Sequence, residues 1–149
     1  MASVLKISEA TSLAFHAMGI LAQNPKKMFS TKEIASFINA SEAHLAKVLQ
    51  RLAKAGLIES VRGPKGGFTV RDGAANTSLL EIYETIDGPL DQNNCLLGPP
   101  ICQGKGCILG GLLSSVNQEV KRYLSETRLS DLEKVFEIGG EEKCLKAAK

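Results

Sequence analysis

The sequence contains no tryptophan, few aromatic residues of any kind and no long apolar run. Aromatic residues make up 5% of the 149 residues, which favours a helical interior of small aliphatic side chains over an aromatic-rich sandwich. No apolar segment approaches the roughly 20 residues needed to cross a bilayer. The first residues lack the basic region, apolar stretch and cleavage site of a signal peptide, so a cytoplasmic protein with no membrane association is expected.

Residue constellations for catalysis are also missing. The chain has only two histidines, His16 and His44, and both fall within predicted helices. No pairing of an acid with a base, and no activated nucleophile, can be recognised in the sequence. The sequence therefore does not predict an enzyme.

Charge is distributed unevenly along the chain, although the net charge is only +2. Residues 26–71 carry nine Lys or Arg against three Glu, whereas residues 72–149 carry a net charge of −4. A basic module followed by an acidic one is typical of a nucleic-acid-binding unit joined to a sensing or oligomerisation unit. Clustering of charges on solvated faces is the alternative. We place the division at residues 1–75 and 76–149.

Three helices are predicted in the first 55 residues. They cover about 8–23, 31–39 and 42–55, with apolar residues at helical spacing and a serine at the start of each. Ser30 and Glu33 have the spacing of a capping box, and Gly56 can end the third helix in a left-handed conformation. The short turn between the second and third helices predicts a bent helix-turn-helix.

A β-hairpin is predicted directly after these helices. Residues 57–61 and 68–70 read as strands, and the turn between them, 62–67, contains two cations and three glycines. A basic hairpin behind a helix-turn-helix is a wing. The fold predicted is thus mainly α with a small β-hairpin: a winged helix-turn-helix followed by a long carboxyl-terminal helix.

Candidate DNA contacts lie at the start of the third helix, along its exposed side and in the turn of the wing. They are Ser41, Glu42, His44, Lys47, Arg51, Arg62, Gly63, Pro64, Lys65 and Gly66. The first residues of a recognition helix contact base edges in the major groove, and later ones meet the phosphate backbone. Arg62 and Lys65 offer charge to phosphates or to a narrow minor groove, while the glycines allow close approach. For any single lysine, a solvated helix face is the alternative.

The second region, residues 76–149, begins with a short predicted helix at 78–86 and continues through a loop rich in Gly and Pro. A long helix follows at about 108–125. Its apolar stripe consists of Leu112, Val116, Val120 and Leu124, widened by Leu109 and Leu113. Such a stripe is either core or a symmetric partner surface. A DNA reader that needs two half-sites favours the homodimer.

Cysteine is absent from the first 94 residues, and Cys95, Cys102 and Cys107 then follow within the loop, with Cys144 near the end. In a cytoplasmic protein this distribution favours a metal or redox role over a disulfide framework. Three soft thiolates in one loop are a plausible ligand set for a metal or cluster. Zinc, a thiol switch and buried structural cysteines remain alternatives.

Several of these segments resemble the Rrf2 family of bacterial repressors. The resemblance covers nearly the whole chain and is carried by residues 13–18, by 32–35, by 44–57 and above all by the Arg-Gly-Pro-x-Gly-Gly-aromatic wing of 60–68. It implies a homodimer that binds double-stranded DNA at an imperfect palindrome. Family members with three cysteines in this loop hold an iron–sulfur cluster there, which implies a two-iron or four-iron cluster on Cys95, Cys102 and Cys107.

The resemblance is imperfect at the cluster. The gaps between the loop cysteines are six and four residues, whereas relatives have two nearly equal gaps. Where relatives have a fourth ligand, this chain has Gly110 or Ser12, which leaves Glu9, His16 and Cys144 as candidates. A cofactor-free repressor controlled by a thiol switch, a metabolite or a partner protein is the second hypothesis.

Overall fold

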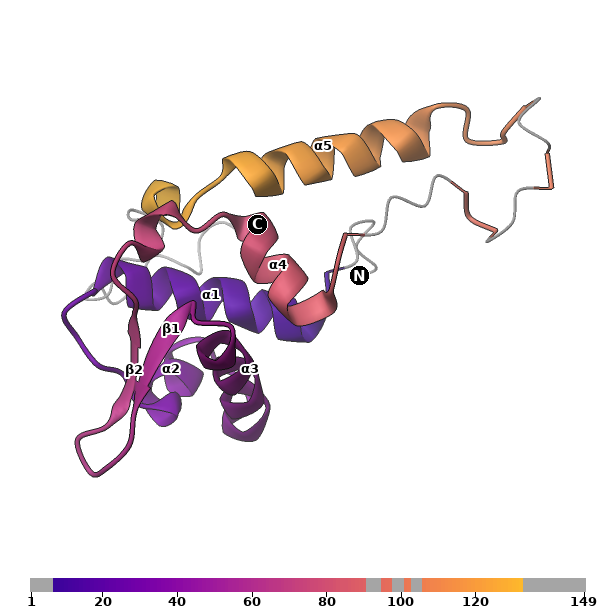
Figure 1. The fold of residues 1–149 in the computed structure, drawn as a ribbon. Helices are drawn as coiled ribbons and strands as arrows, with labels where there is room; N and C mark the ends of the chain where they lie inside the picture. Colours follow the sequence, from indigo (N-terminus) through magenta and orange to yellow (C-terminus); the bar gives the residue numbers. More distant parts are fainter. Residues whose placement is uncertain (1–6, 91–94, 98–100, 103–105, 133–149) are drawn as a thin grey trace, which may run out of the picture.

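The computed structural model describes residues 7–90, 95–97, 101–102 and 106–132, and its described part is mainly helical (Figure 1). Helices α1 (Glu9–Gln23), α2 (Thr31–Phe37) and α3 (Glu42–Lys54) precede strands β1 (Ile58–Val61) and β2 (Gly67–Val70). A short 3-10 turn, η1 (Ala74–Asn76), leads to α4 (Leu79–Asp87), α5 (Leu112–Glu126) and η2 (Leu129–Leu132). The predicted winged helix-turn-helix with a long later helix is confirmed.

Serine side chains start the first four helices. The hydroxyls of Ser8, Ser30, Ser41 and Ser78 each accept a hydrogen bond from the backbone N–H three residues later. Complete capping boxes form at Ser30 with Glu33 and at Ser78 with Glu81, as the spacing predicted. These bonds satisfy backbone donors that a helix cannot pair within itself, and so they define where each helix begins.

Two left-handed residues set the angle of α3. Asn39, in the turn between α2 and α3, has a φ of 52°, a conformation in which asparagine is enriched. The N–H of Ala40 then donates to the carbonyl of Ala35 at 2.9 Å, which closes the end of α2. Gly56 has a φ of 76° and ends α3, as expected. The helix-turn-helix geometry is therefore fixed at both ends of α3.

The wing is fastened to the helical body through its second strand. β1 and β2 are antiparallel, with Ile58 opposite Val70 and Val61 opposite Gly67. Phe68 exchanges two backbone hydrogen bonds with Phe29, of 2.9 and 2.8 Å, so an isolated β-bridge joins β2 to the segment before α2. The hairpin is thus held at its base, and its turn extends beyond the domain (Figure 1).

One hydrophobic core unites the wing with the first four helices. α1 lies at its centre and packs against both α3 and α4. Residues of the core that are at most 2% exposed include Met18, Ile20, Leu21, Ile34, Leu45, Val48, Leu49, Leu52, Ile82 and Leu129. Because α4 contributes its apolar face to the same core, the segment that leads into the cysteines is anchored to the DNA-binding domain.

α5 joins this body only at its carboxyl-terminal end. Leu124 is buried, and residues 127–129 pair with 77–79 through backbone bonds of 2.9 and 3.0 Å. The first half of α5 projects away from the domain (Figure 1). α5 begins at Leu112, later than the predicted residue 108, because Gly110 has a left-handed φ of 55° and Gly111 is a poor helix former. No helix in the described ranges is long and apolar enough to span a membrane.

Candidate DNA interface and cysteine hollow

α3 presents three different faces. Leu45, Val48, Leu49 and Leu52 form its buried face. The opposite face carries Lys47, Gln50 and Lys54, all exposed to solvent. A helix turns once every 3.6 residues, so these three side chains lie within one arc, as a surface that enters a DNA groove requires. Of the candidates on α3, Lys47 is the cation on this outer face that comes earliest in the helix.

His44 and Arg51 lie on the flank of α3, seven residues or about two turns apart. His44 Nδ1 is 3.6 Å from Glu9 Oε1 of α1, which allows an ion pair when the imidazole is protonated. The Arg51 guanidinium donates to the carbonyl oxygen of Thr85, at 3.4 Å, and to that of Ile86. The structure therefore places both candidates in contacts with neighbouring helices. No sequence signal indicates these contacts, because tertiary packing alone brings the groups together.

Ser41 and Glu42 lie at the amino-terminal end of α3. The Ser41 hydroxyl accepts from the His44 N–H at 3.4 Å and is exposed, as is the Glu42 side chain. An exposed cap keeps the first turn of α3 accessible while it fixes the direction of the helix. This is the end of α3 that was predicted to approach base edges.

The turn of the wing separates structural glycines from exposed cations. Arg62, Pro64 and Lys65 are exposed, and a Cβ added at Gly63 would meet nothing within 4 Å. By contrast, a Cβ at Gly66 would lie 2.1 Å from the carbonyl oxygen of Val61. Gly66 is therefore required by the turn itself, while the tip at 62–65 is open to a ligand.

The glycine of β2 has a structural reason of its own. A Cβ at Gly67 would lie 2.5 Å from the carbonyl oxygen of Phe29, where the wing pairs with the body. Only a residue without a side chain permits this close approach of two backbones. The prediction that wing glycines allow close approach to DNA therefore applies to Gly63, because contacts within the protein already explain the other two glycines.

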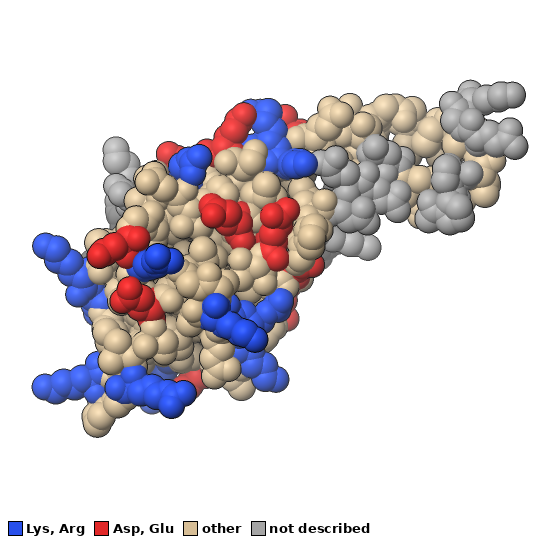
Figure 2. Space-filling model, in the orientation of Figure 1, with Lys and Arg blue, Asp and Glu red and all other residues tan. Residues whose placement is uncertain are grey.

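Basic side chains gather around the wing and α3. In the view of Figure 2, Lys and Arg cover the edge of the domain that carries the hairpin and α3. The projecting first half of α5 shows only uncharged residues in the same view. Positive potential is thus concentrated where the helix-turn-helix and wing present their exposed residues, as phosphate contact requires.

The three loop cysteines lie around one apolar hollow of about 200 Å³. Its lining also includes Leu96, Leu97, Ile101, Gly106, Ile108, Leu109 and Leu113. Cys95 and Cys102 are partly buried, and Cys107 is exposed. We call this site the cysteine hollow. The sequence predicted a shared loop, and the structure adds that all three cysteines line a common low-polarity space beside the start of α5.

The cysteines are not gathered into a ligand cage in this structure. Among the described residues, no three His, Cys, Asp or Glu side chains lie close enough together to hold a metal ion. Cys144, one of the candidates for a fourth ligand, lies outside the described residues. His16 Nδ1 is 2.7 Å from the carbonyl oxygen of Ser12, so this part of its ring is engaged along α1.

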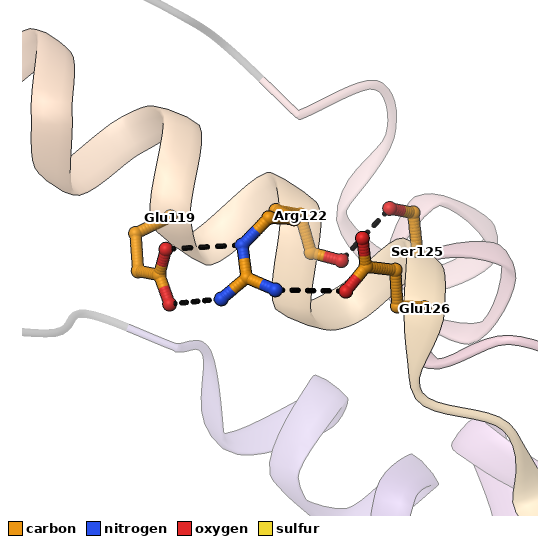
Figure 3. A network of polar contacts seen from close by, with 4 residues as sticks. All are labelled: Glu119, Arg122, Ser125 and Glu126. Atoms are coloured by element: carbon orange, nitrogen blue, oxygen red, sulfur yellow. Dashed lines mark hydrogen bonds and ion pairs between the residues drawn. The ribbon is translucent and has the colours of Figure 1, made fainter.

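α5 and the residues that lead into it divide into two chemically different parts. Residues 106–118, which are the residues 106–111 before α5 and its first two turns and which we call the α5 arm, contain no charged side chain, and Leu112 and Val116 there are 59% and 39% exposed. The second half carries the network of Figure 3, in which Arg122 contacts Glu119 and, at 2.8 Å, Glu126. Hydrogen bonding to Arg122 lowers the pKa of the Glu119 carboxyl, and the same bonds raise the pKa of Arg122.

The fold and the basic surface define a DNA-binding transcriptional regulator of the winged helix-turn-helix class, rather than an enzyme. Residues 7–134 match the Rrf2 family, which is described as an iron-dependent transcriptional regulator. The chain belongs to this family, as the wing motif indicated.

Individual relatives cover most of the chain. The regulator NsrR of Halalkalibacterium halodurans is 28% identical over 137 residues, which span 86% of this chain and 90% of the relative. The structure of CymR, the global cysteine regulator of B. subtilis, is 27% identical, has a TM-score of 0.74, and is covered over 90% of this chain and 100% of its own. The oxidized form of Staphylococcus aureus CymR is similar at 28% identity and a TM-score of 0.69, over 89% and 99% of the two chains.

Proposed function

We propose that this protein is a homodimeric repressor that responds to redox state, nitric oxide or iron–sulfur status through a cluster held by Cys95, Cys102 and Cys107. The observation that carries the proposal is the cysteine hollow, an apolar site lined by all three loop cysteines and by residues at the start of α5. The description of the family as an iron-dependent transcriptional regulator supports a signal linked to iron.

DNA recognition is assigned to two elements. The outer face of α3, with Lys47 and the end at Ser41 and Glu42, is exposed, and we expect it to enter the major groove. Arg62 and Lys65 at the tip of the wing contact phosphates or the neighbouring minor groove. Two such units on a symmetric dimer read two half-sites about 34 Å apart, or a multiple of that distance.

The α5 arm is the proposed dimer contact. Leu112 and Val116 of the arm, and Tyr123 beyond it, are exposed along one side of α5, while Leu124 is buried in the chain's own core. Large exposed apolar residues in a row mark an interaction surface. A second copy of the same arm covers them with a surface of matching character, as a two-fold symmetric interface does.

The residues of the hollow fit an iron–sulfur cluster in donor chemistry. Thiolate is the donor that such clusters require, and the residues around a cluster tune its reactivity. Such a cluster supplies a redox-active group that is sensitive to oxidants and nitric oxide. Cys95 and Cys102 lie partly buried while Cys107 is exposed, so the chain provides two protected ligands and one accessible ligand.

The DNA-binding state depends on how the segment between α4 and α5 is arranged. One end of that segment is the last turn of α4, which packs in the core, and the other is the α5 arm, which continues into the part of α5 that joins the body. Allosteric coupling is typically about 1–3 kcal/mol, which changes affinity roughly 5- to 150-fold. We expect an operator affinity that changes within this range when the state of the cysteines changes.

Anaerobic purification tests the proposal most directly. We expect a coloured protein with visible charge-transfer absorption and matched amounts of iron and sulfide, lost when Cys95, Cys102 and Cys107 are replaced together by Ser. The Cys144→Ser variant is the matched control, and it also tests whether Cys144 is a fourth ligand. A colourless protein without iron or sulfide after anaerobic reconstitution refutes the cluster and leaves DNA binding intact.

A thiol switch is the second candidate. The solved oxidized form of S. aureus CymR shows that oxidation is a described state within the family. In this chain, three cysteines line the same hollow, and two of them would form a disulfide if an oxidant accepted their electrons and protons. Peroxide that alters DNA affinity in the colourless protein, reversibly with dithiothreitol, would favour the switch.

A further inference from the structure

The last turn of α4 is where the cysteine segment begins. Gly88 caps α4 and its N–H donates to the carbonyl of Glu84. The N–H of Leu90 then approaches Glu84 Oε1 at 3.5 Å, so the chain stays close to α4 for two residues more. Residues 84–90 are therefore the described part of the chain to which the cysteine segment is joined.

Two other helices are bonded to this same turn. From α3, the Arg51 guanidinium donates to the carbonyl oxygens of Thr85 and Ile86. From α1, the hydroxyls of Ser8 and Thr11 donate to the Asp87 carboxylate at 2.8 and 2.9 Å. Terminal carbonyls of a helix lack partners within the helix and carry partial negative charge, so a guanidinium is well suited to hold them.

Arg51 connects that turn to the helix that reads DNA. It lies on the flank of α3 together with His44, which is 3.6 Å from Glu9 of α1. α3 is therefore tied to α4 near its carboxyl-terminal end and to α1 near its amino-terminal end. A short α-helix moves as a rigid element. A shift of the α4 turn that displaces the Arg51 side chain therefore changes the direction of the outer face of α3.

We propose that Arg51 is a positioning residue that transmits the state of the cysteine segment to the recognition helix, rather than a phosphate contact. The proposal rests on the proposed function, because it takes the segment after α4 as the sensing element. It assigns the guanidinium a role that its position on a basic recognition helix did not predict.

A substitution at Gly88 can alter the conformation of the last turn of α4. Its φ of 83° and ψ of −176° belong to a region that is essentially restricted to glycine. A Cβ added there would meet nothing within 4 Å, so Gly88→Ala strains the backbone without creating a clash. The substitution therefore perturbs the base of the segment and leaves both the cysteines and α3 chemically unchanged.

The experiment is a double-mutant cycle on operator affinity, measured in the full chain freed of any cluster. We expect Gly88→Ala to change Kd by about 5-fold or more when Arg51 is present, the lower end of typical allosteric coupling. With Arg51→Gln the same change should fall below about 2-fold. Arg51→Lys keeps a cationic donor for the carbonyls and should restore part of the response.

Arg71→Gln is the matched control. Arg71 also donates to a backbone carbonyl, that of Gly56 at 3.5 Å, at the end of α3, but this contact comes from the residue after β2. The Gly88→Ala effect should persist fully in this background. Loss of the response in both Arg51→Gln and Arg71→Gln would overturn the specific role of Arg51.

Salt dependence separates positioning from phosphate contact. Each phosphate contact contributes about 0.9 to the slope of log affinity against log salt concentration. Arg51→Gln should leave the slope of the wild-type chain unchanged, whereas Lys47→Gln should reduce it by about 0.9. A similar reduction for Arg51→Gln would overturn the proposal and return Arg51 to the DNA surface.

The outcomes also separate this proposal from the cluster. If Gly88→Ala has an equal effect with and without Arg51, or no effect with Arg51 present, the positioning role of Arg51 is overturned whatever the absorption spectrum shows. If the protein is colourless but the Gly88→Ala effect depends on Arg51, the cluster is refuted and the positioning role of Arg51 is supported. Thermal melting confirms that each variant folds, and Asp87→Asn, which weakens the bonds to α1, replaces Gly88→Ala should that chain fail to fold.

Discussion

α3 and α5 are both amphipathic helices, yet the chain covers the apolar face of only one of them. α3 buries Leu45, Val48, Leu49 and Leu52 beneath α1, α2 and α4. α5 buries Leu124 alone, and Leu112 and Val116 remain 59% and 39% exposed. An apolar stripe thus identifies a helix that needs a partner, and the tertiary structure shows whether the chain itself supplies that partner.

The difference has an energetic meaning. The winged domain is a unit whose stability comes from its own contacts, whereas the α5 arm gains stability only when something covers it. Burial of an apolar side chain contributes roughly 1.5–3 kcal/mol, so several exposed residues on a charge-free arm are a strong driving force for association. Mutations in the two regions should therefore differ in how their effects depend on protein concentration.

The largest effect is expected from charges placed on the arm. Leu112→Glu with Val116→Glu should convert the dimer to a monomer, because the interface would then bury like charges. Operator affinity should fall by about 100-fold or more, since joining two binding modules raises avidity by 10²–10⁴. Sedimentation and gel-shift titration measure the two quantities.

Ser114→Glu with Gln118→Glu is the matched control, because these residues lie on the other side of α5. It adds the same charge and should leave both the dimer and operator affinity unchanged. A dimer that survives Leu112→Glu with Val116→Glu would show that another surface of the chain mediates association.

In the winged domain, Leu49→Ala should lower the free energy of unfolding by about 2–5 kcal/mol, the range for deleting a buried leucine side chain. Leu49 is 0% exposed and lies at the centre of the α3 contact. Urea unfolding should give the same loss at low and high protein concentration. Leu112→Ala should instead produce a loss that depends on concentration, and equal behaviour of the two variants would remove the distinction between the regions.

The success of sequence-based prediction follows this division. Helix starts at Ser8, Ser30, Ser41 and Ser78 and the stop at Gly56 were predictable, because caps and left-handed glycines act through neighbours in the chain. The start of α5 was predicted too early, because the apolar pattern continues through residues 108–111 although Gly110 and Gly111 cannot extend the helix. Helix caps could therefore be predicted from the sequence, whereas the residue at which an apolar pattern stops being helical could not.

The candidate site shows the same limit. The exposed tip of the wing and the outer position of Lys47 could be inferred from glycine, proline and charge. The contact of Arg51 with α4 carbonyls could not, because carbonyl acceptors have no residue type that reveals them. Sequence analysis cannot in general predict hydrogen bonds between a side chain and backbone groups that are distant in the sequence.

A smaller effect is expected at the wing. Arg62→Ala with Lys65→Ala should reduce the slope of log affinity against log salt concentration by about 0.9 for each phosphate that these two side chains neutralise. The fold should not change, because both side chains are exposed at the tip. Lys121→Ala, which removes an exposed cation from α5, should leave the slope unaltered. An unchanged slope for the double variant would exclude phosphate binding by the wing.

The smallest effect is expected at the cap of α2. Hydrogen bonds from the Ser30 backbone N–H and then from its hydroxyl lower the pKa of the Glu33 carboxyl below its ordinary value. A lowered pKa in the folded state stabilises the protein above the ordinary carboxyl pKa, and this contribution disappears as the pH falls through the lowered value.

Glu33→Gln should therefore cost less than about 1 kcal/mol at pH 7, the typical value of a whole cap. Its difference from the wild-type chain should shrink as the pH falls from 5 towards 3, as urea unfolding at each pH will show. Ser30→Ala removes the hydroxyl but leaves the backbone N–H donor of residue 30, so it should retain part of this pH dependence. A Glu33→Gln difference that stayed constant across that range would mean that the carboxylate charge contributes nothing to the cap, and that the start of α2 is held by neutral hydrogen bonds and packing alone.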